Sequence, residues 1–207
     1  MSVGRPPRDF RLIAPEGWFD VDLDPPTMFE TIDRLVDERL TQAPAAEPRR
    51  DEILAIARRG VTEAAAAGAF RAWFFSDVID GRPVSASLTA TVARLEDASV
   101  DGRGPRGVAE RLAQTAASSG TRAKLAATEL PAGPAVRLRR HVEAPAAGRA
   151  TKVGSVSVQY FLAIPSTRSV LLLSFATPNL ALEEPFLALF DSIVATLRWV
   201  EPAEAAP

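Results

Sequence analysis

The sequence predicts an α+β protein in which a mainly antiparallel sheet is sandwiched between helices. Three observations support this fold class. Several segments alternate apolar and polar residues with the period of two that is typical of half-buried strands. Neighbouring strand-like segments are joined by turns of a few residues, whereas parallel strands need a connection of a dozen or more. Amphipathic segments with helical spacing lie near both ends of the chain, and each needs a surface to cover its apolar stripe.

The first predicted elements are two short strands, at residues 10–13 and 18–23, joined by a turn that contains Pro15 and Gly17. Asp24 and the two prolines after it mark a helix start, because Asp accepts hydrogen bonds from exposed amides and proline is tolerated in a first helical turn. A second amphipathic segment follows a proline-containing break. We expect these two helices to form an N-terminal helical hairpin, an insert over residues 25–68.

The middle of the chain predicts a β-hairpin followed by a short helix. Residues 70–79 are apolar at both odd-numbered and even-numbered positions, which indicates a strand covered on both faces. Residues 84–95 alternate apolar residues with serine and threonine, as in a strand with one solvated face. A turn that contains Gly81 joins the two strands. A glycine-rich loop at residues 101–107 then leads into a predicted helix over residues 105–117.

The C-terminal half predicts four more strands and a last helix. The strands are expected at residues 124–130, 136–142, 155–164 and 170–176. The helix begins near Glu183 and carries a broad apolar stripe, and because each such side chain contributes on the order of 1.5–3 kcal/mol when buried, it has to lie against the sheet. The element order ββ-αα-ββ-α-ββ-ββ-α predicts one domain over residues 8–199 and a disordered tail at residues 200–207.

The composition excludes several kinds of protein. The chain has 207 residues, 47% of them hydrophobic and 24% charged, and a net charge of −2, so neither a disordered protein nor a dedicated nucleic-acid binder is expected. Without cysteine it has no disulfide, thiolate metal site or lipidation site. No apolar run reaches the ~20 residues of a membrane span, and no signal-peptide pattern is present, which favours a cytoplasmic protein. Arginine in place of lysine, with much alanine and proline, indicates a bacterium with a GC-rich genome.

Three segments of turn and apolar residues together point to a known family. They are the strand, turn and strand at residues 10–23 that contain Pro15, Gly17 and Trp18, the strand–turn–strand at residues 129–136, and the run of residues 159–198 that joins two strands to the last helix. This combination resembles the PsbP-like superfamily, which includes photosystem oxygen-evolving subunits, Ran-binding Mog proteins and LpqN-type proteins. The resemblance implies an antiparallel sheet between helices and a protein partner, and it supplies no catalytic residue.

The sequence offers few groups for chemistry. His141 is the single histidine, so a mechanism or metal site that needs two is excluded. We expect it on the solvated side of a strand, with a general base or pH-sensing group as the functional alternative. Most carboxylates are expected to be solvated, but Asp77 alternates in phase with Trp73 and Phe75, which also allows a partly buried position near the end of its strand. No G-x-S-x-G motif surrounds a serine, and the loop at residues 101–107 lacks a complete phosphate-binding motif, so we interpret it as a flexible connection.

The candidate binding surface is a basic patch around one predicted hairpin. If its side chains share a face, they attract an acidic protein partner or, as a weaker alternative, a nucleic acid. No aromatic residue is interleaved for base stacking, and a solvated sheet face without a function is the other alternative. The patch consists of Arg122, Lys124, Arg137, Arg139 and Arg140.

These observations favour a non-enzymatic, cytoplasmic protein-binding or assembly accessory module with no cofactor and no metal. Its partner surface is expected on the exposed side of the sheet or on the N-terminal helical hairpin. The alternative is a small-ligand-binding protein or an enzyme with a cleft between sheet and helices. A deep apolar pocket with converging polar groups near His141 or Asp77 favours that alternative.

Overall fold

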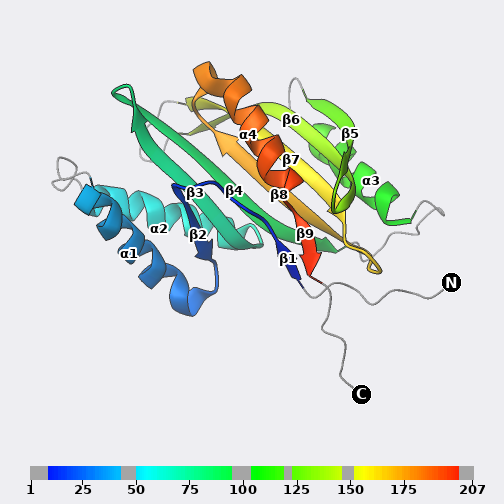
Figure 1. Cartoon of the computed structure of the whole chain (residues 1–207), viewed down its shortest axis with the longest axis horizontal. Helices are drawn as coiled ribbons and strands as arrows, with labels where there is room; N and C mark the ends of the chain where they lie inside the picture. Colours follow the sequence, from blue (N-terminus) through cyan, green and yellow to red (C-terminus); the bar gives the residue numbers. More distant parts are fainter. Residues whose placement is uncertain (1–8, 43–49, 95–103, 119–122, 146–151, 201–207) are drawn as a thin grey trace.

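A seven-stranded antiparallel sheet forms the centre of the molecule (Figure 1). The structure, a computed structural model, describes residues 9–42, 50–94, 104–118, 123–145 and 152–200. Within these residues the strand order is β2-β3-β4-β8-β7-β6-β5, so most strands that follow one another in the chain also pair in the sheet. The strands are β2 (Trp18–Asp22), β3 (Ala69–Ile79), β4 (Arg82–Arg94), β5 (Lys124–Leu130), β6 (Gly133–Pro145), β7 (Lys152–Ala163) and β8 (Ser169–Thr177).

The antiparallel sheet predicted from the sequence is therefore confirmed, with strand ends shifted by a few residues. The β3–β4 hairpin turns at Asp80 and Gly81, whose φ values of 51° and 74° suit the tight turns that match the twist of paired strands. In the β3–β4 register, Trp73 lies opposite Leu88 and Ala72 opposite Thr89. Because directly paired residues point to the same side, this register defines two faces of the sheet.

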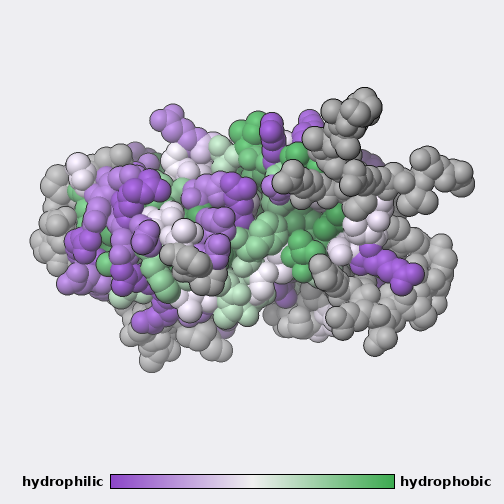
Figure 2. Space-filling view, turned by 90° about the horizontal axis from the view of Figure 1, so that it is seen from below, coloured by the Kyte–Doolittle hydropathy of each residue, from purple (hydrophilic) through white to green (hydrophobic). Residues whose placement is uncertain are grey.

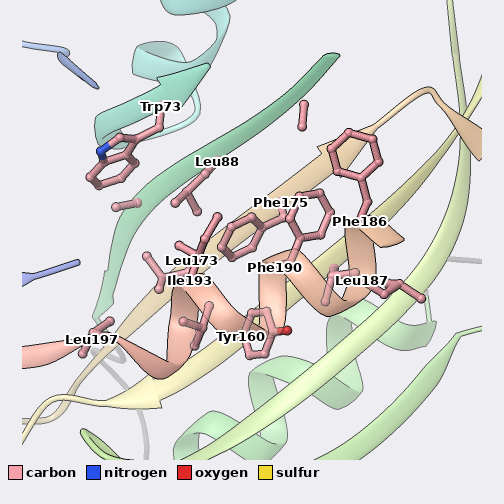
Figure 3. Close-up of a cluster of buried hydrophobic side chains, with 14 of the residues drawn as sticks. Trp73, Leu88, Tyr160, Leu173, Phe175, Phe186, Leu187, Phe190, Ile193 and Leu197 are labelled. Atoms are coloured by element: carbon pink, nitrogen blue, oxygen red, sulfur yellow. The ribbon is translucent and has the colours of Figure 1, made fainter. Parts of the chain in front are cut away.

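Helix α4 (Glu183–Ala195) covers the face to which Trp73 and Leu88 point. Figure 3 shows its apolar side chains directed at those of the strands beneath it. Phe190 stacks on Phe175 of β8 with 4.6 Å between ring centroids, and both side chains are fully buried. This is the apolar stripe that the sequence predicts, and it forms the main core.

The opposite face carries the other three helices, so helices cover both faces of the sheet, as predicted (Figure 1). Helices α1 (Pro25–Gln42) and α2 (Arg50–Ala66) pack on β2 and the first half of β3 in a second, separate core that includes Val21, Val61 and Ala72. Helix α3 (Gly104–Ser118) packs on β6, β7 and β8. Only the first half of β3 is covered on both faces, because Ser76–Ile79 are exposed.

Ion pairs connect α1 to α2 on their outer surface. Arg58 of α2 forms a two-pronged pair with Asp33 of α1, and the Arg50 guanidinium lies 2.6 Å from the Asp37 carboxylate. The helical end of the molecule has a largely hydrophilic exterior, visible as the purple region at the left of Figure 2. The centre of the same view is more hydrophobic.

The first and last strands pair with each other, which the sequence did not predict. Strand β1 (Asp9–Arg11) forms a two-stranded antiparallel sheet with β9 (Arg198–Val200), with Phe10 opposite Trp199. The sequence predicts a turn that joins β1 directly to β2 and no strand after the last helix. A three-residue strand has too few positions for a period of two to be recognised, and its partner lies almost at the other end of the described chain.

Candidate functional site

A cleft of about 920 Å³ lies between the α1–α2 pair and the face of the sheet that this pair covers. Its volume is in the range of small-molecule sites in proteins. The helical wall is aliphatic, the β3 side contributes aromatic rings, and the part that extends over β4 and β7 carries hydroxyl groups. The helical wall includes Ile32, Leu35 and Val36 of α1 and Ile53, Ile56 and Ala57 of α2.

The cleft exists because the helices and the sheet are in close contact at one end only. Val21 and Ala72 pack against Val61 at the end where β2 lies. Strand β2 begins at Trp18, which pairs with Phe75 of the antiparallel β3. The last four residues of β3 therefore have no strand beside them on that side. Toward this end the helices face the sheet across open space.

Small side chains deepen the cleft on both walls. Gly60 of α2 lines it, and a Cβ at this position would meet no atom within 4 Å. On the sheet, Ser85 and Ser87 of β4 and Ser155 of β7 also line it. From β3 to β7 the cleft crosses three strand spacings, which is about 14 Å.

The hydroxyl-lined part continues across the open face of the sheet. Ser87 pairs with Ala176 of β8, and Ala176 pairs with Ser157 of β7, so small residues follow one another across three strands. Within the described residues, the hydroxyls of Ser85 and Ser87 have no hydrogen-bond partner. The sheet therefore presents hydroxyl groups that are available to a ligand.

In the described part of the chain, two charged side chains line the cleft, and they pair with each other at its rim. The Arg39 Nη2 atom lies 2.8 Å from the Asp77 Oδ1 atom and donates to the Ser76 carbonyl oxygen at 2.5 Å. Arg39 is in the last turn of α1, where a cation interacts favourably with the helix dipole. Asp77, for which the sequence allows a partly buried position, is half exposed, with 51% of its side chain accessible.

The structure divides the residues of the predicted basic patch between the two faces of the sheet. Arg137 and Arg139 of β6 point to the α4 side, whereas Arg140 alternates to the other side. Lys124 is exposed and pairs in register with Arg139. Arg122 lies outside the described residues, as do residues 101–103 of the predicted loop, whereas residues 104–107 of that loop form the first turn of α3. Lys124, Arg137 and Arg139 therefore point to the same side of the sheet, and Arg140 does not share their face.

Carboxylates of α4 pair with Arg137, Arg139 and His141. The Glu183 carboxylate accepts a hydrogen bond from the Arg139 guanidinium at 2.6 Å and lies 3.0 Å from the His141 Nε2 atom. Burial opposes ionisation of Glu183, but the hydrogen bonds from His141 and Arg139 outweigh it and lower the pKa of this carboxyl. Arg137 lies 2.9 Å from the Asp191 carboxylate. These contacts fasten α4 to the sheet.

His141 and the cleft lie on opposite sides of the sheet. His141 belongs to the cluster under the first turn of α4, and the cleft serines are on the side of α1 and α2. The structure therefore does not bring the single histidine to these serines. In the part of the chain that the structure describes, no three His, Cys, Asp or Glu side chains gather in a way that suits a metal ion.

Sequence reasoning missed Arg39, Gly60 and the cleft serines as site residues. Ser85 and Ser87 alternate with apolar residues, and the same alternation describes a solvated strand face and a cleft floor. A glycine inside an amphipathic helix was the available signal at Gly60, because glycine weakens a helix and needs another reason to be there.

No protein-family model matches the chain, and none of the curated proteins matches it either. None of the helices in the described ranges has the length and apolar character required to cross a membrane.

Proposed function

We propose that this protein is a non-enzymatic binding protein that holds an elongated, amphiphilic small molecule in the cleft between α1–α2 and the sheet. The observation that carries the proposal is the cleft itself, which combines an aliphatic wall with a row of hydroxyl groups. Small-molecule sites are typically apolar clefts with a few converging polar groups. Of the functions that the sequence suggested, this geometry supports the small-ligand alternative best.

The arrangement of polar groups favours binding over catalysis. The charged residues that line the cleft, Arg39 and Asp77, neutralise each other. Activation of a serine requires a neighbouring base, and His141 is on the other side of the sheet. The expected N-terminal helical hairpin then has a role of its own, as the wall that covers an apolar ligand. The PsbP-like resemblance and the cytoplasmic location stay predictions from the sequence.

The substitution Gly60→Phe tests this proposal. Phenylalanine has a higher helix propensity than glycine, so α2 should keep its stability while the ring fills the cleft. We expect the fluorescence of bound N-phenyl-naphthylamine, a neutral apolar probe, to show binding to the wild-type protein that is about tenfold weaker in the variant, equivalent to 1.4 kcal/mol.

Ala55→Phe is the matched control, since Ala55 is exposed on the same helix and does not line the cleft. This variant should bind the probe like the wild type. If the wild-type protein does not bind the probe, or if both variants bind it equally well, the cleft is not the binding site.

A protein partner is the second candidate, and the projecting end of the β3–β4 hairpin favours it (Figure 1). Val78 and Ile79 are 67% and 46% exposed there. Exposed neighbouring apolar side chains of this kind are common in protein interfaces. Affinity purification from the native host should then enrich one protein with the wild-type chain and lose it with Val78→Asp. Equal recovery with both chains contradicts a partner at this hairpin.

A further inference from the structure

We propose that the ligand of the cleft carries a carboxylate head group, that Arg39 binds this carboxylate, and that Asp77 occupies its position when no ligand is bound. The inference rests on the proposed binding function and names the ligand as a single-chain amphiphilic acid.

The charged side chains of the cleft favour an acidic ligand. Among the described residues that line the cleft, Arg39 is the cation and Asp77 is the anion. An arginine beside an apolar cleft provides a fixed, always protonated group that is suited to a carboxylate. The group that Arg39 now holds is itself a carboxylate, at 2.8 Å. Arg39 is therefore already oriented for this head group.

The Asp77 side chain can move away from Arg39 while Arg39 keeps its contact with β3. The Ser76 carbonyl oxygen accepts a hydrogen bond from Arg39 at the part of β3 that lies beyond the end of β2. This contact involves the backbone of β3 and does not depend on the Asp77 carboxylate. Asp77 is half exposed, so water can solvate its charge once a ligand carboxylate has taken its place.

A carboxylate head group bound at Arg39 would lie beside the serines of β4. Ser76 pairs in register with Ser85 of β4, so the Arg39 contact lies one strand away from the hydroxyl row. A carboxylate at Arg39 has acceptor oxygens for further hydrogen bonds, and the hydroxyls of Ser85 and Ser87, which bond to no other described residue, can donate to them. The alkyl chain then extends between the aliphatic residues of α1 and α2.

Displacement of the naphthylamine probe by two ligands of equal chain length, dodecanoate and dodecanol, tests the inference. The wild-type protein should bind dodecanoate about tenfold more tightly than dodecanol, because hydrogen bonds to charged groups are stronger than neutral ones. Asp77→Asn should tighten dodecanoate severalfold and leave dodecanol unchanged, because it removes the competing charge. Arg39→Gln should abolish the preference for the acid.

Two control variants separate this effect from general charge and stability. Asp80→Asn makes the same charge change on the same hairpin, at a φ of 51° that asparagine tolerates, and should leave dodecanoate binding unchanged. Arg34→Gln removes a cation from the exposed side of α1 and should also have no effect. Circular dichroism spectra should show that each variant is folded, and the Asp77→Asn result tests the inference even if Arg39→Gln is unstable.

Each outcome distinguishes the two proposals. If dodecanol and dodecanoate bind the wild-type protein equally well, or if Asp77→Asn weakens dodecanoate, the carboxylate inference is wrong and the cleft remains a binding site. If dodecanoate binds more tightly but Asp80→Asn changes its affinity as much as Asp77→Asn does, the general charge of the hairpin is responsible and the inference is also wrong. If neither compound displaces the probe, the proposed function itself fails.

Discussion

The hydroxyl of Tyr160 lies beneath α4, where it donates a hydrogen bond to Asp191 and accepts one from the Arg137 Nε atom at 3.2 Å. Burial and the hydrogen bond to Asp191 raise the pKa of this hydroxyl far above its usual value. Tyr160 is the single tyrosine of the chain, so the absorbance of tyrosinate reports on it alone. We expect no ionisation near pH ~10, where a free tyrosine titrates. Tyrosinate should appear only as the protein unfolds in stronger alkali, and a titration near pH ~10 in the folded protein contradicts this prediction.

The same raised pKa makes the contribution of Tyr160 to stability depend on pH. The folded state holds the proton more tightly than the unfolded chain, so the contribution is complete below about pH 10 and is lost as the pH rises above it. Tyr160→Phe should lower the free energy of unfolding by about 1–2 kcal/mol at neutral pH, because Arg137 and Asp191 lose a buried partner. Urea denaturation measures this difference, which should shrink in alkaline buffer.

Glu183 predicts the opposite dependence on pH. Its folded pKa is lowered, so its contribution is present above the ordinary pKa of about 4.3 and is lost as the pH falls through the lower folded value. Glu183→Gln should destabilise the protein near neutral pH and weaken its acid sensitivity below about pH 4.3. Glu184→Gln is the control, since that side chain is mostly exposed, and its unfolding should follow the wild type. Identical acid profiles for both variants refute the role of Glu183.

At the scale of elements, one glycine within α2 and one just after it differ in the backbone conformation that they adopt. Gly68 ends the α2–β3 connection with a φ of +85°, whereas Gly60 has ordinary helical geometry and open space around it. Gly68→Ala should lower the free energy of unfolding by about 1–2 kcal/mol, because the left-handed region is unfavourable for a residue with a Cβ. Gly60→Ala should raise it by about 0.5–1 kcal/mol. Thermal unfolding of both variants checks the pair, and a shift of the same sign in both contradicts it.

The sequence predicted the elements whose information is local. The alternation in β4 and β7, the turn at Asp80 and Gly81 and the apolar stripe of α4 each lie within a short window, and each is confirmed. The pairing of β1 with β9 is not local, and a three-residue strand carries no recognisable period. The last helix also ends at Ala195, two residues before the end of its apolar pattern at Leu197, because the chain turns there to enter β9.

The candidate site was less predictable for a related reason. Its walls come from α1, α2 and several strands of the sheet, β2, β3, β4, β7 and β8, and a cleft depends on the distance between elements as well as on their residues. Arg39 is one of many arginines in the sequence, and only its position beside Asp77 distinguishes it from them. Arg140 does not share the face of the other described members of the basic patch, because it follows Arg139 directly in a strand and successive residues of a strand point to opposite faces.

At the scale of the whole molecule, the described residues form three hydrophobic cores, the first beneath α4, the second beneath α1 and α2, and the third beneath α3. The second is smaller, and the ion pairs between its helices are on the surface, where such pairs contribute little. We therefore expect the α1–α2 pair to open at a lower free energy than the central strands. In hydrogen exchange, amides around Val61 should exchange faster than those around Leu173.

The substitution Val61→Ala gives a second test of this difference between the cores. The substitution removes two methyl groups from the second core and should lower its opening free energy by about 2 kcal/mol. Exchange in α1 and α2 should accelerate, while exchange around Leu173 stays unchanged. Equal acceleration in both regions indicates that the two cores unfold as one cooperative unit.

The pairing of β1 with β9 has a consequence for how the protein is made. A ribosome synthesises residue 9 early and residue 200 after every other strand described, yet these two residues face each other in the finished fold. Until then Phe10, which is buried in the main core, has no ladder to hold it in place. Contacts between distant parts of a chain form slowly, so this ribbon should be assembled last, and a nascent chain stalled before residue 198 should leave its first strand accessible to chaperones or proteases.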